Sequence, residues 1–217
     1  MDNLTIRDLL QRAELDMLQM QMNPHFLFNT LNSIGALAQM ENAPRVGEII
    51  ERLSGILRHS LTALTQFVPL DSEVAIAADY IAIQQIRFDG KPGYVERIDT
   101  NARAAQVPCM VIQPLIENAV LHAFPKLKEG DMIQLDVRTH ESGLEVAVED
   151  NGIGLEPSHI ERLLNGRETA DARRGIGLTN VIRRMRILYG DGHVVITSRP
   201  GHGTRVVLSL PHRPRTV

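Results

Sequence analysis

The chain has 217 residues, of which 43% are hydrophobic and 23% charged, a composition typical of a globular protein rather than a disordered one. Its formal net charge of −3 argues against nucleic-acid binding through bulk positive charge. A single cysteine excludes an internal disulfide and a cysteine zinc site. The sequence has no apolar run of about 18 residues and no signal-peptide pattern at its start. We therefore expect no membrane contact from this segment and a cytoplasmic location.

Residues 4–66 lack strand-like alternation and instead show helical periodicity. Apolar positions recur at alternating steps of three and four from residue 10 to residue 38 (Leu10, Ala13, Met17, Met20, Pro24, Leu27, Leu31, Ile34 and Ala38). This seam predicts a long helix packed against other helices. Asn42-Ala43-Pro44 interrupts it, and a second stripe follows (Val46, Ile49, Leu53, Ile56, Ser60 and Leu64). One helical hairpin buries only one face of each helix, so we expect two copies to pair as a homodimer in a four-helix bundle.

The rest of the chain predicts an α+β fold, in which the helical hairpin is followed by an α/β sandwich. A connector at 67–70 leads into a helix to about residue 88, with Asp71 as its expected N-cap. Further helices are predicted at 110–123 and 177–189, and strands at 94–100, 132–139, 144–149, 194–198 and 204–210. The strands at 132–149 form an expected hairpin that turns at Ser142-Gly143. The predicted domains are 1–66 and 67–217.

Three glycine-bearing loops carry the chemistry of the second domain. In Asp150-Asn151-Gly152-Ile153-Gly154 the glycines permit close approach of a ligand, and Asp150 can accept a hydrogen bond from an exocyclic amine such as that of adenine. Arg174-Gly175-Ile176-Gly177-Leu178 opens a helix whose N–H groups suit phosphate oxygens. Gly201-His202-Gly203-Thr204 is the third loop. Each loop alone fits an ordinary tight turn, and neither a dinucleotide fingerprint nor a P-loop is present.

The predicted helix at 110–123 is apolar except for a few polar residues that stand out. Among them are Glu117 and Asn118. The Asn118 amide oxygen is a suitable hard ligand for magnesium. The alternative is that both residues face solvent on the exposed side of a helix.

These loops and helices stand in a known order. Asn118, Asp150-x-Gly152-x-Gly154, Gly175-x-Gly177 and Gly203-Thr204 resemble the N, G1, G2 and GT elements of the GHKL (Bergerat) ATP-binding fold, which histidine kinases, gyrase and MutL share. Residues 21–34, QMNPHFLFNTLNSI, resemble the phosphoacceptor segment of LytS-type sensor histidine kinases, and QPLIENA at 113–119 resembles their N-box. Segments at 57–60, 80–84 and 86–88 support the same family, and the resemblance spans about residues 18–211.

The resemblance implies a reaction and a set of roles. ATP, with Mg²⁺, passes its γ-phosphoryl group to His25, and the group then moves to an aspartate on a response regulator receiver domain. Asp150 would recognise adenine, Asn118 would hold magnesium, and Thr204 would lie near adenine. The implied nucleotide contacts also include His122, Arg174, Gly152, Gly154, Gly175, Gly177 and Leu178. Asn29, one turn after His25, is expected to orient the imidazole or an attacking water, and Glu117 to order a metal-bound water or to cap the site.

The sequence departs from its relatives at two points and leaves two other functions open. Phe26 follows His25 where many histidine kinases have an acidic residue, and Leu121 stands where the family often has a lysine. A phosphate contact is then either absent or supplied by His122, Arg173 or Arg174. The alternatives are a GHKL ATPase without phosphotransfer and a degenerate kinase that acts as a scaffold. Members of the family usually carry sensor segments upstream, so this chain is interpreted either as the cytoplasmic part of a longer, membrane-anchored kinase or as a naturally short kinase.

Overall fold

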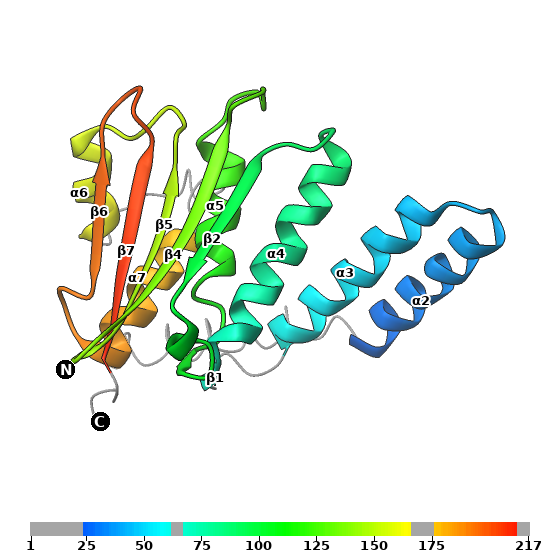
Figure 1. Ribbon diagram of the computed structural model, residues 1–217, viewed down its shortest axis with the longest axis horizontal. Coiled ribbons are helices and arrows are strands. Elements are labelled where there is room, and N and C mark those ends of the chain that lie inside the picture. The colour runs from blue at the N-terminus through cyan, green and yellow to red at the C-terminus, as the bar shows by residue number, and fades with distance from the viewer. Residues whose placement is uncertain (1–23, 62–66, 166–175, 212–217) are drawn as a thin grey trace, which may run out of the picture. The chain divides into compact units, whose positions relative to one another are not determined.

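The computed structural model describes residues 24–61, 67–165 and 176–211, which belong to two units (Figure 1). The first unit is a helical hairpin within residues 1–61, and the second is a lobe of helices and strands within residues 62–217. Each unit is described by itself. Within the described ranges, no helix is both long and apolar enough to cross a bilayer.

The hairpin consists of α2 (Pro24–Met40) and α3 (Pro44–Leu61). The predicted break between them is confirmed: Asn42 adopts a positive φ of 50°, and the Ala43 N–H donates to the Ala38 carbonyl at 2.8 Å. This left-handed residue ends α2, and Pro44 is favoured in the first turn of α3 because it has no N–H to leave unpaired there. The beginning of the predicted long helix, residues 10–23, lies outside the described residues.

The lobe is built on a five-stranded mixed sheet, as the fold prediction expected. Its order is β2-β4-β5-β7-β6, with β2 and β4 parallel and the other neighbours antiparallel. The strands are β2 (Gly93–Ile98), β4 (Met132–His140), β5 (Gly143–Asp150), β6 (Val194–Ser198) and β7 (Thr204–Pro211). Helices α4 (Leu70–Arg87), α5 (Gln113–His122) and α7 (Ile176–Tyr189) lie on one face of the sheet (Figure 1). The α+β prediction is therefore confirmed.

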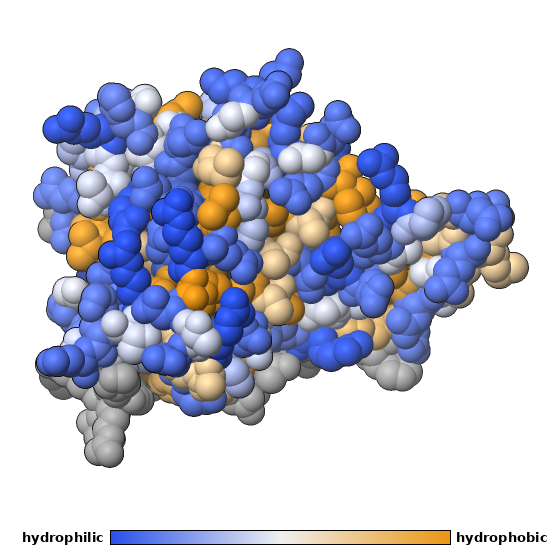
Figure 2. Space-filling model, viewed as in Figure 1, coloured by the Kyte–Doolittle hydropathy of each residue, from blue (hydrophilic) through white to orange (hydrophobic). Residues whose placement is uncertain are grey.

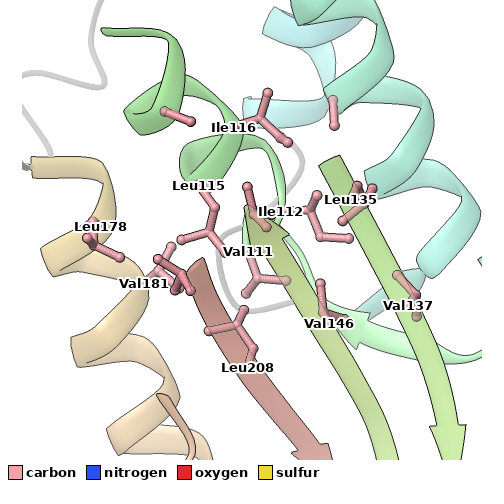
Figure 3. Close-up of a cluster of buried hydrophobic side chains, with 14 of the residues drawn as sticks. Val111, Ile112, Leu115, Ile116, Leu135, Val137, Val146, Leu178, Val181 and Leu208 are labelled. Carbon is pink, nitrogen blue, oxygen red and sulfur yellow. The ribbon is translucent and has the colours of Figure 1, made fainter. Parts of the chain in front are cut away.

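The lobe core lies between the sheet and these helices (Figure 3). Strand alternation produces it: Ile133, Leu135 and Val137 of β4 are 0–1% exposed and face the helices. Leu208 from β7 and Leu115 from α5 join the same cluster. Full burial of one such side chain stabilises the fold by about 1.5–3 kcal/mol.

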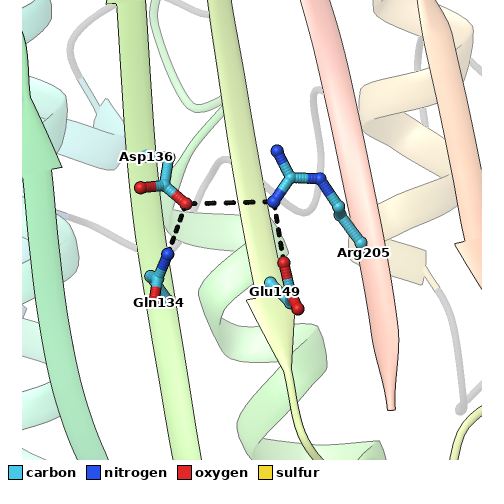
Figure 4. Close-up of polar contacts among 4 residues, drawn as sticks. All are labelled: Gln134, Asp136, Glu149 and Arg205. Carbon is cyan, nitrogen blue, oxygen red and sulfur yellow. Dashed lines mark hydrogen bonds and ion pairs between the residues drawn. The ribbon is translucent and has the colours of Figure 1, made fainter. Parts of the chain in front are cut away.

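The opposite face of the sheet carries polar side chains between the core residues (Figure 4). Asp136, though only 5% exposed, accepts a hydrogen bond from Gln134 Nε2 at 2.6 Å. The Arg205 guanidinium lies 3.9 Å from Asp136 and 2.7 Å from Glu149. Hydrophilic residues cover much of this region in Figure 2. The sheet therefore has one apolar face and one face held by a charged network.

Two short strands and a helix were absent from the sequence prediction. The segment expected to be a connector forms β1 (Phe67–Pro69), which pairs antiparallel with β3 (Gln106–Pro108). Between β2 and β3 lies a 3₁₀ turn, Thr100–Ala102, and after β5 comes α6 (Pro157–Leu164). Strands of three residues are too short for alternation to reveal, because they hold at most two positions of the same face.

Two predicted helix starts are wrong. Pro69, rather than Asp71, is the N-cap of α4, and Asp71 lies in the first turn, where it pairs with Arg103 at 2.5 Å. Helix α5 begins at Gln113 instead of 110, since Met110 has a φ of 60° that no helix accommodates. The expected hairpin is confirmed, but its turn lies at Glu141-Ser142, one residue before the predicted position, with His140 and Gly143 paired across it.

Candidate functional site

Asp150 is the last residue of β5 and its side chain is nearly buried, at 8% exposure. Its Oδ1 accepts hydrogen bonds from the Gly152 N–H at 2.9 Å and the Thr204 N–H at 3.2 Å. The second bond follows from the strand register, in which Asp150 lies opposite Thr204. Both bonds end on the same oxygen, so across the described residues Oδ2 keeps its lone pairs for a further donor.

The environment of Asp150 perturbs its acidity. Burial raises the pKa of this carboxyl to about 6, although the hydrogen bonds from Gly152 and Thr204 act in the opposite direction and favour the charged form. The nearby charge of Glu149 adds a smaller upward contribution. At neutral pH the group is therefore a buried carboxylate, an acceptor that gains from any donor that pairs with it.

Glycines let the loop after Asp150 lie directly against its neighbours. A Cβ on Gly152 would overlap Ala123 at the end of α5, and one on Gly154, with φ +69°, would overlap the Arg199 carbonyl. A Cβ on Gly203, with φ +76°, would overlap the carbonyl of Asp150 itself. The loop is bonded on both sides, through Ile153 N–H to the Ala123 carbonyl at 2.9 Å and Gly203 N–H to the Gly152 carbonyl at 2.9 Å. Side chains are excluded here, so the glycines let this loop pack directly against the protein's own backbone.

Ser198 is a residue of this region that sequence reasoning missed. Its hydroxyl donates to the Gly203 carbonyl at 2.7 Å, lies 3.0 Å from the Thr204 hydroxyl, and accepts from the Leu155 N–H at 2.8 Å. It thereby ties the loop after β5 to the loop before β7. The only sequence signal was a polar residue at the end of a predicted strand, which is common at any strand end.

Helix α5 presents the polar residues that the sequence singled out. Asn118, Glu117 and His122 are all of intermediate exposure, so Glu117 and Asn118 do not simply face solvent. Glu117 accepts from Gln113 Nε2 at 3.0 Å. Burial is the largest cause that raises the pKa of Tyr80 in α4, and the charge of Glu117 is the second. Glu117 therefore lies close to α4. Gln113, a second residue that sequence reasoning did not assign a role, is 4% exposed, and within the described part of the chain its Oε1 has no hydrogen-bond partner.

Helix α7 begins against the start of α5. An added Cβ on Gly177 would lie 3.4 Å from the Pro114 carbonyl oxygen, so the two helices approach closely there. The Leu178 side chain is 2% exposed and belongs to the core, which leaves only its backbone for a ligand contact. Arg174 and Gly175 lie outside the described residues. The structure thus brings α5 between the start of α7 and the loop that follows Asp150.

The helical hairpin carries the other two predicted site residues. His25 is the second residue of α2, and its backbone is helical. Asn29 lies one turn later and is exposed, with its carbonyl accepting from the Ser33 hydroxyl at 2.9 Å. The spacing of the two residues along one helix is that expected from the sequence.

The lobe fits an adenine nucleotide and magnesium on its own features. Asp150 offers an acceptor to an exocyclic amine, and the glycines beside it pack against the protein's own backbone and so fix the loop that holds this carboxylate. Asn118 supplies an amide oxygen, the ligand type that Mg²⁺ accepts beside phosphate oxygens. Gln113 adds, at the start of the same helix, an acceptor that has no partner among the described residues.

Two family models match the chain. The one described as histidine kinase matches residues 13–92, and the one described as histidine kinase-, DNA gyrase B-, and HSP90-like ATPase matches residues 105–214, just over half of the chain. His25 and Asn29 fall within the first match, and the residues of α5, Asp150 and the glycine loops within the second. The resemblance seen in the sequence is confirmed.

Curated relatives agree with these matches along nearly the whole chain. The sensor histidine kinase YesM of Bacillus subtilis is 30% identical over 100% of this chain and 36% of its own length. The sensor protein LytS of Enterococcus faecalis is 33% identical over 94% of this chain and 35% of its own length. The chain therefore spans about a third of the length of these relatives.

A solved structure supports the fold of the lobe. The catalytic domain of histidine kinase ThkA is 15% identical, with a TM-score of 0.53, and the match covers 69% of this chain and 97% of that domain. At this identity the likeness concerns the fold alone.

Proposed function

Because the chain belongs to the histidine kinase-, DNA gyrase B-, and HSP90-like ATPase family, we propose that it is the core of a sensor histidine kinase. In this proposal it phosphorylates its own His25 from ATP and passes the phosphoryl group to an aspartate of a response regulator. The observation that carries the proposal is that one chain joins a histidine kinase match containing His25 to an ATPase match containing the buried Asp150 carboxylate.

We assign recognition of the nucleotide to the lobe. Asp150 accepts the exocyclic amine of adenine on Oδ2, while Gly152, Gly154 and Thr204 hold the carboxylate and the loop in place. The start of α7, with Gly175, Gly177, the Leu178 backbone and Arg174, binds the phosphates through N–H groups and positive charge. His122 contributes the contact that Leu121 cannot make.

Asn118 is the residue that would hold Mg²⁺ together with the phosphate oxygens, and the bound ion neutralises phosphate charge. Glu117, which Gln113 orients, orders a water near this position. Both roles depend on α5 being held in a fixed position relative to the glycine loops.

The transfer itself needs a nucleophile in line with the γ-phosphorus. An unprotonated ring nitrogen of His25 forms the N–P bond as the bond to the β–γ bridging oxygen breaks. ADP leaves with that electron pair, and the proton on the other ring nitrogen is released. In the second step the N–P bond breaks and a carboxylate oxygen of the receiver domain takes the phosphoryl group. Asn29 orients the imidazole or, for dephosphorylation, a water.

We also propose that the chain acts as a homodimer through its hairpin and that its domains are 1–66 and 67–217. Large apolar residues of the hairpin remain exposed, which supports pairing of two copies (Ile34 40%, Leu37 57%, Met40 77%, Val46 43% and Leu53 40%). The curated relatives are about three times longer, and our proposal extends to a sensor domain upstream of this segment in a longer protein and to a cytoplasmic location of the segment itself.

Incubation with ATP labelled at the γ-phosphate tests the proposal. We expect acid-labile, base-stable label on the full chain and complete loss of label in His25→Ala. His140→Ala, which removes an exposed histidine of the lobe, is the matched control and keeps the label. Phosphate release without labelled protein would favour the ATPase alternative, and absence of nucleotide binding would favour the scaffold.

A further inference from the structure

Glu73 of α4 is fully buried, at 0% exposure, and its carboxylate is bonded to the backbone of another element. Oε1 accepts from the Met110 N–H at 2.7 Å, and Oε2 accepts from the Val111 and Ile112 N–H groups at 2.9 and 3.0 Å. Three consecutive amides thus converge on one side chain 37 to 39 residues away in sequence.

These amides lie immediately before α5, the helix that carries Asn118. The N-cap of α5 is Ile112, which has no side chain able to cap, and Pro114 removes one backbone donor from the first turn. Met110 has a φ of 60°, so the peptide groups of 110–112 turn their N–H groups inward as an anion-binding concavity. Glu73 fills that concavity and supplies the negative charge that a helix N-terminus favours.

The same part of α4 is fixed to the segment that leads into α5. The Leu70 N–H donates to the Ala105 carbonyl at 2.8 Å, and the Asp71 N–H to the Arg103 carbonyl at 3.0 Å. Residues 103–112 are therefore held along the first turn of α4, with Glu73 as the last and most buried attachment. Because of these bonds, we expect a shift of Glu73 to shift the start of α5 as well.

Glu73 also acts on the second helix of the nucleotide site. Burial lowers the pKa of Arg184 in α7, while the charges of Cys109 and Glu73 raise it. The Glu73 carboxylate therefore lies close enough to stabilise a half-buried guanidinium on the helix that begins with Gly177. The carboxylate from α4 is thus bonded to the start of α5, and its charge also acts on a residue of α7.

We propose that Glu73 is a positioning residue for magnesium–nucleotide binding, which it supports by fixing the start of α5 and hence the position of Asn118. This inference rests on the proposed function for the identity of the ligand. It assigns to α4 a role in the site although none of the nucleotide contacts proposed above comes from α4.

The test measures binding of a non-hydrolysable ATP analogue to the full chain at increasing Mg²⁺ concentration. Glu73→Gln keeps the size of the side chain but replaces one acceptor oxygen with a donor that faces N–H groups. We expect the Mg²⁺ concentration for half-maximal binding to rise roughly tenfold, the range seen when the support of a metal ligand is removed. Affinity for the analogue in EDTA, which depends on Asp150, is expected to stay within about twofold.

Val74→Ala is the matched control. Val74 is the next residue of the same helix, is 4% exposed, and belongs to the core without bonding to residues 110–112. We expect this variant to lower the melting temperature and leave the Mg²⁺ dependence unchanged. Glu73→Asp, which keeps the buried charge but reaches less far, is expected to give a smaller shift of about threefold, and it carries the test if the Gln variant does not fold.

An unchanged Mg²⁺ dependence in both Glu73 variants would overturn the inference and leave the proposed function standing. Conversely, a chain that binds magnesium and nucleotide but never labels His25 would refute the kinase proposal while the Glu73 test remains decisive. A parallel loss of affinity in EDTA and in Mg²⁺ would show general damage to the lobe and would also overturn the positioning role.

Discussion

The hairpin and the lobe bury their apolar residues to different degrees. In the lobe, side chains from β4, β5, β7, α5 and α7 are almost entirely removed from water, as Leu135 and Leu208 are at 0% exposure. Of the hydrophobic side chains described in the hairpin, only Ala38 is buried, and Leu37 and Met40 are 57% and 77% exposed. A sheet covered by helices completes a core within one chain, whereas two helices cannot. The described apolar residues of the lobe thus find cover within the lobe, and the exposed apolar residues of the hairpin are those that the proposed dimer would cover.

The largest effects are expected from two variants. One should remove nucleotide binding and keep the dimer, and the other should remove the dimer and keep nucleotide binding. Asp150→Asn places an amide donor where an acceptor for adenine is needed, so nucleotide affinity should fall at least roughly 100-fold while the homodimer persists. Calorimetric titration with an ATP analogue measures the first, and sedimentation equilibrium the second.

Leu37→Lys is the complementary variant, which should disrupt the dimer and leave nucleotide binding intact. A charge on the exposed apolar face of α2 should convert the dimer to a monomer, with nucleotide affinity unchanged because the lobe core contains no hairpin residue. If the Lys variant stayed dimeric, pairing through this face would be refuted, and unaltered binding in Asp150→Asn would remove Asp150 from the adenine role.

A second pair of variants compares burial directly. Leu208→Ala deletes a fully buried side chain of β7 and is expected to lower the free energy of unfolding of the lobe by about 2–5 kcal/mol. Leu37→Ala, at a position 57% exposed, should change lobe unfolding by less than about 0.5 kcal/mol. Urea titration followed by circular dichroism measures both, and equal losses would contradict the idea that the lobe completes its own core.

The pH dependence of stability is also expected to differ between the two units, because Asp150 lies in the lobe. The folded lobe holds the Asp150 proton up to a pKa of about 6, against 3.8 for the ordinary group, so it binds more protons than the unfolded chain between these values. Its free energy of unfolding therefore falls as pH rises through this window, by roughly 3 kcal/mol for a shift of about two pKa units. Asp150→Asn removes this dependence and makes the ligand-free lobe more stable at pH 7. Equal pH profiles for the variant and the parent, measured by thermal unfolding between pH 4 and 7, would argue against it.

The smallest effects are expected where the units are alike, at their exposed ion pairs. Arg52 bonds Glu48 at 2.9 Å in the hairpin, and Arg103 bonds Asp71 at 2.5 Å in the lobe. Because both pairs are solvated, Glu48→Gln and Asp71→Asn should each change stability by about 0–1 kcal/mol. A loss well above this range in thermal unfolding at low salt, for either variant, would show that charge rather than apolar burial distinguishes the units.

Much of the fold was predictable because it follows from local patterns. The helical seam, the break at Pro44 and the alternation of Ile133, Leu135 and Val137 each depend on residues close in sequence. The small sheet of β1 and β3 was not predictable, because it pairs residues about 40 positions apart over only three residues each. The late start of α5 depends on the positive φ of Met110, which no rule for a methionine anticipates.

The residues of the candidate site also divide into those that the sequence indicated and those that it did not. Asp150 and the glycine loops stood out, since a carboxylate followed by spaced glycines after a strand is a recognisable local pattern. Ser198 and Glu73 carried no such signal, because a serine at a strand end and a glutamate in a first turn are common on any surface. Gln113 lies in the N-box segment, but nothing in the sequence indicated that its side chain is buried. Only the tertiary fold shows Ser198 and Glu73 bonded to backbone groups and Gln113 buried beside Glu117.

The small sheet has a mechanical consequence. Phe67 pairs with Pro108 at the end of β1 that receives the chain from residues 62–66, and Pro108 is also the end of β3 that leads toward α5. Tension between these two exits would peel the pairs one after another from the Phe67 end, instead of loading them all together in shear. With two prolines among its six residues, the sheet has few amide donors to resist. A pull on these two exits would therefore meet the three pairs singly, beginning with Phe67 and Pro108.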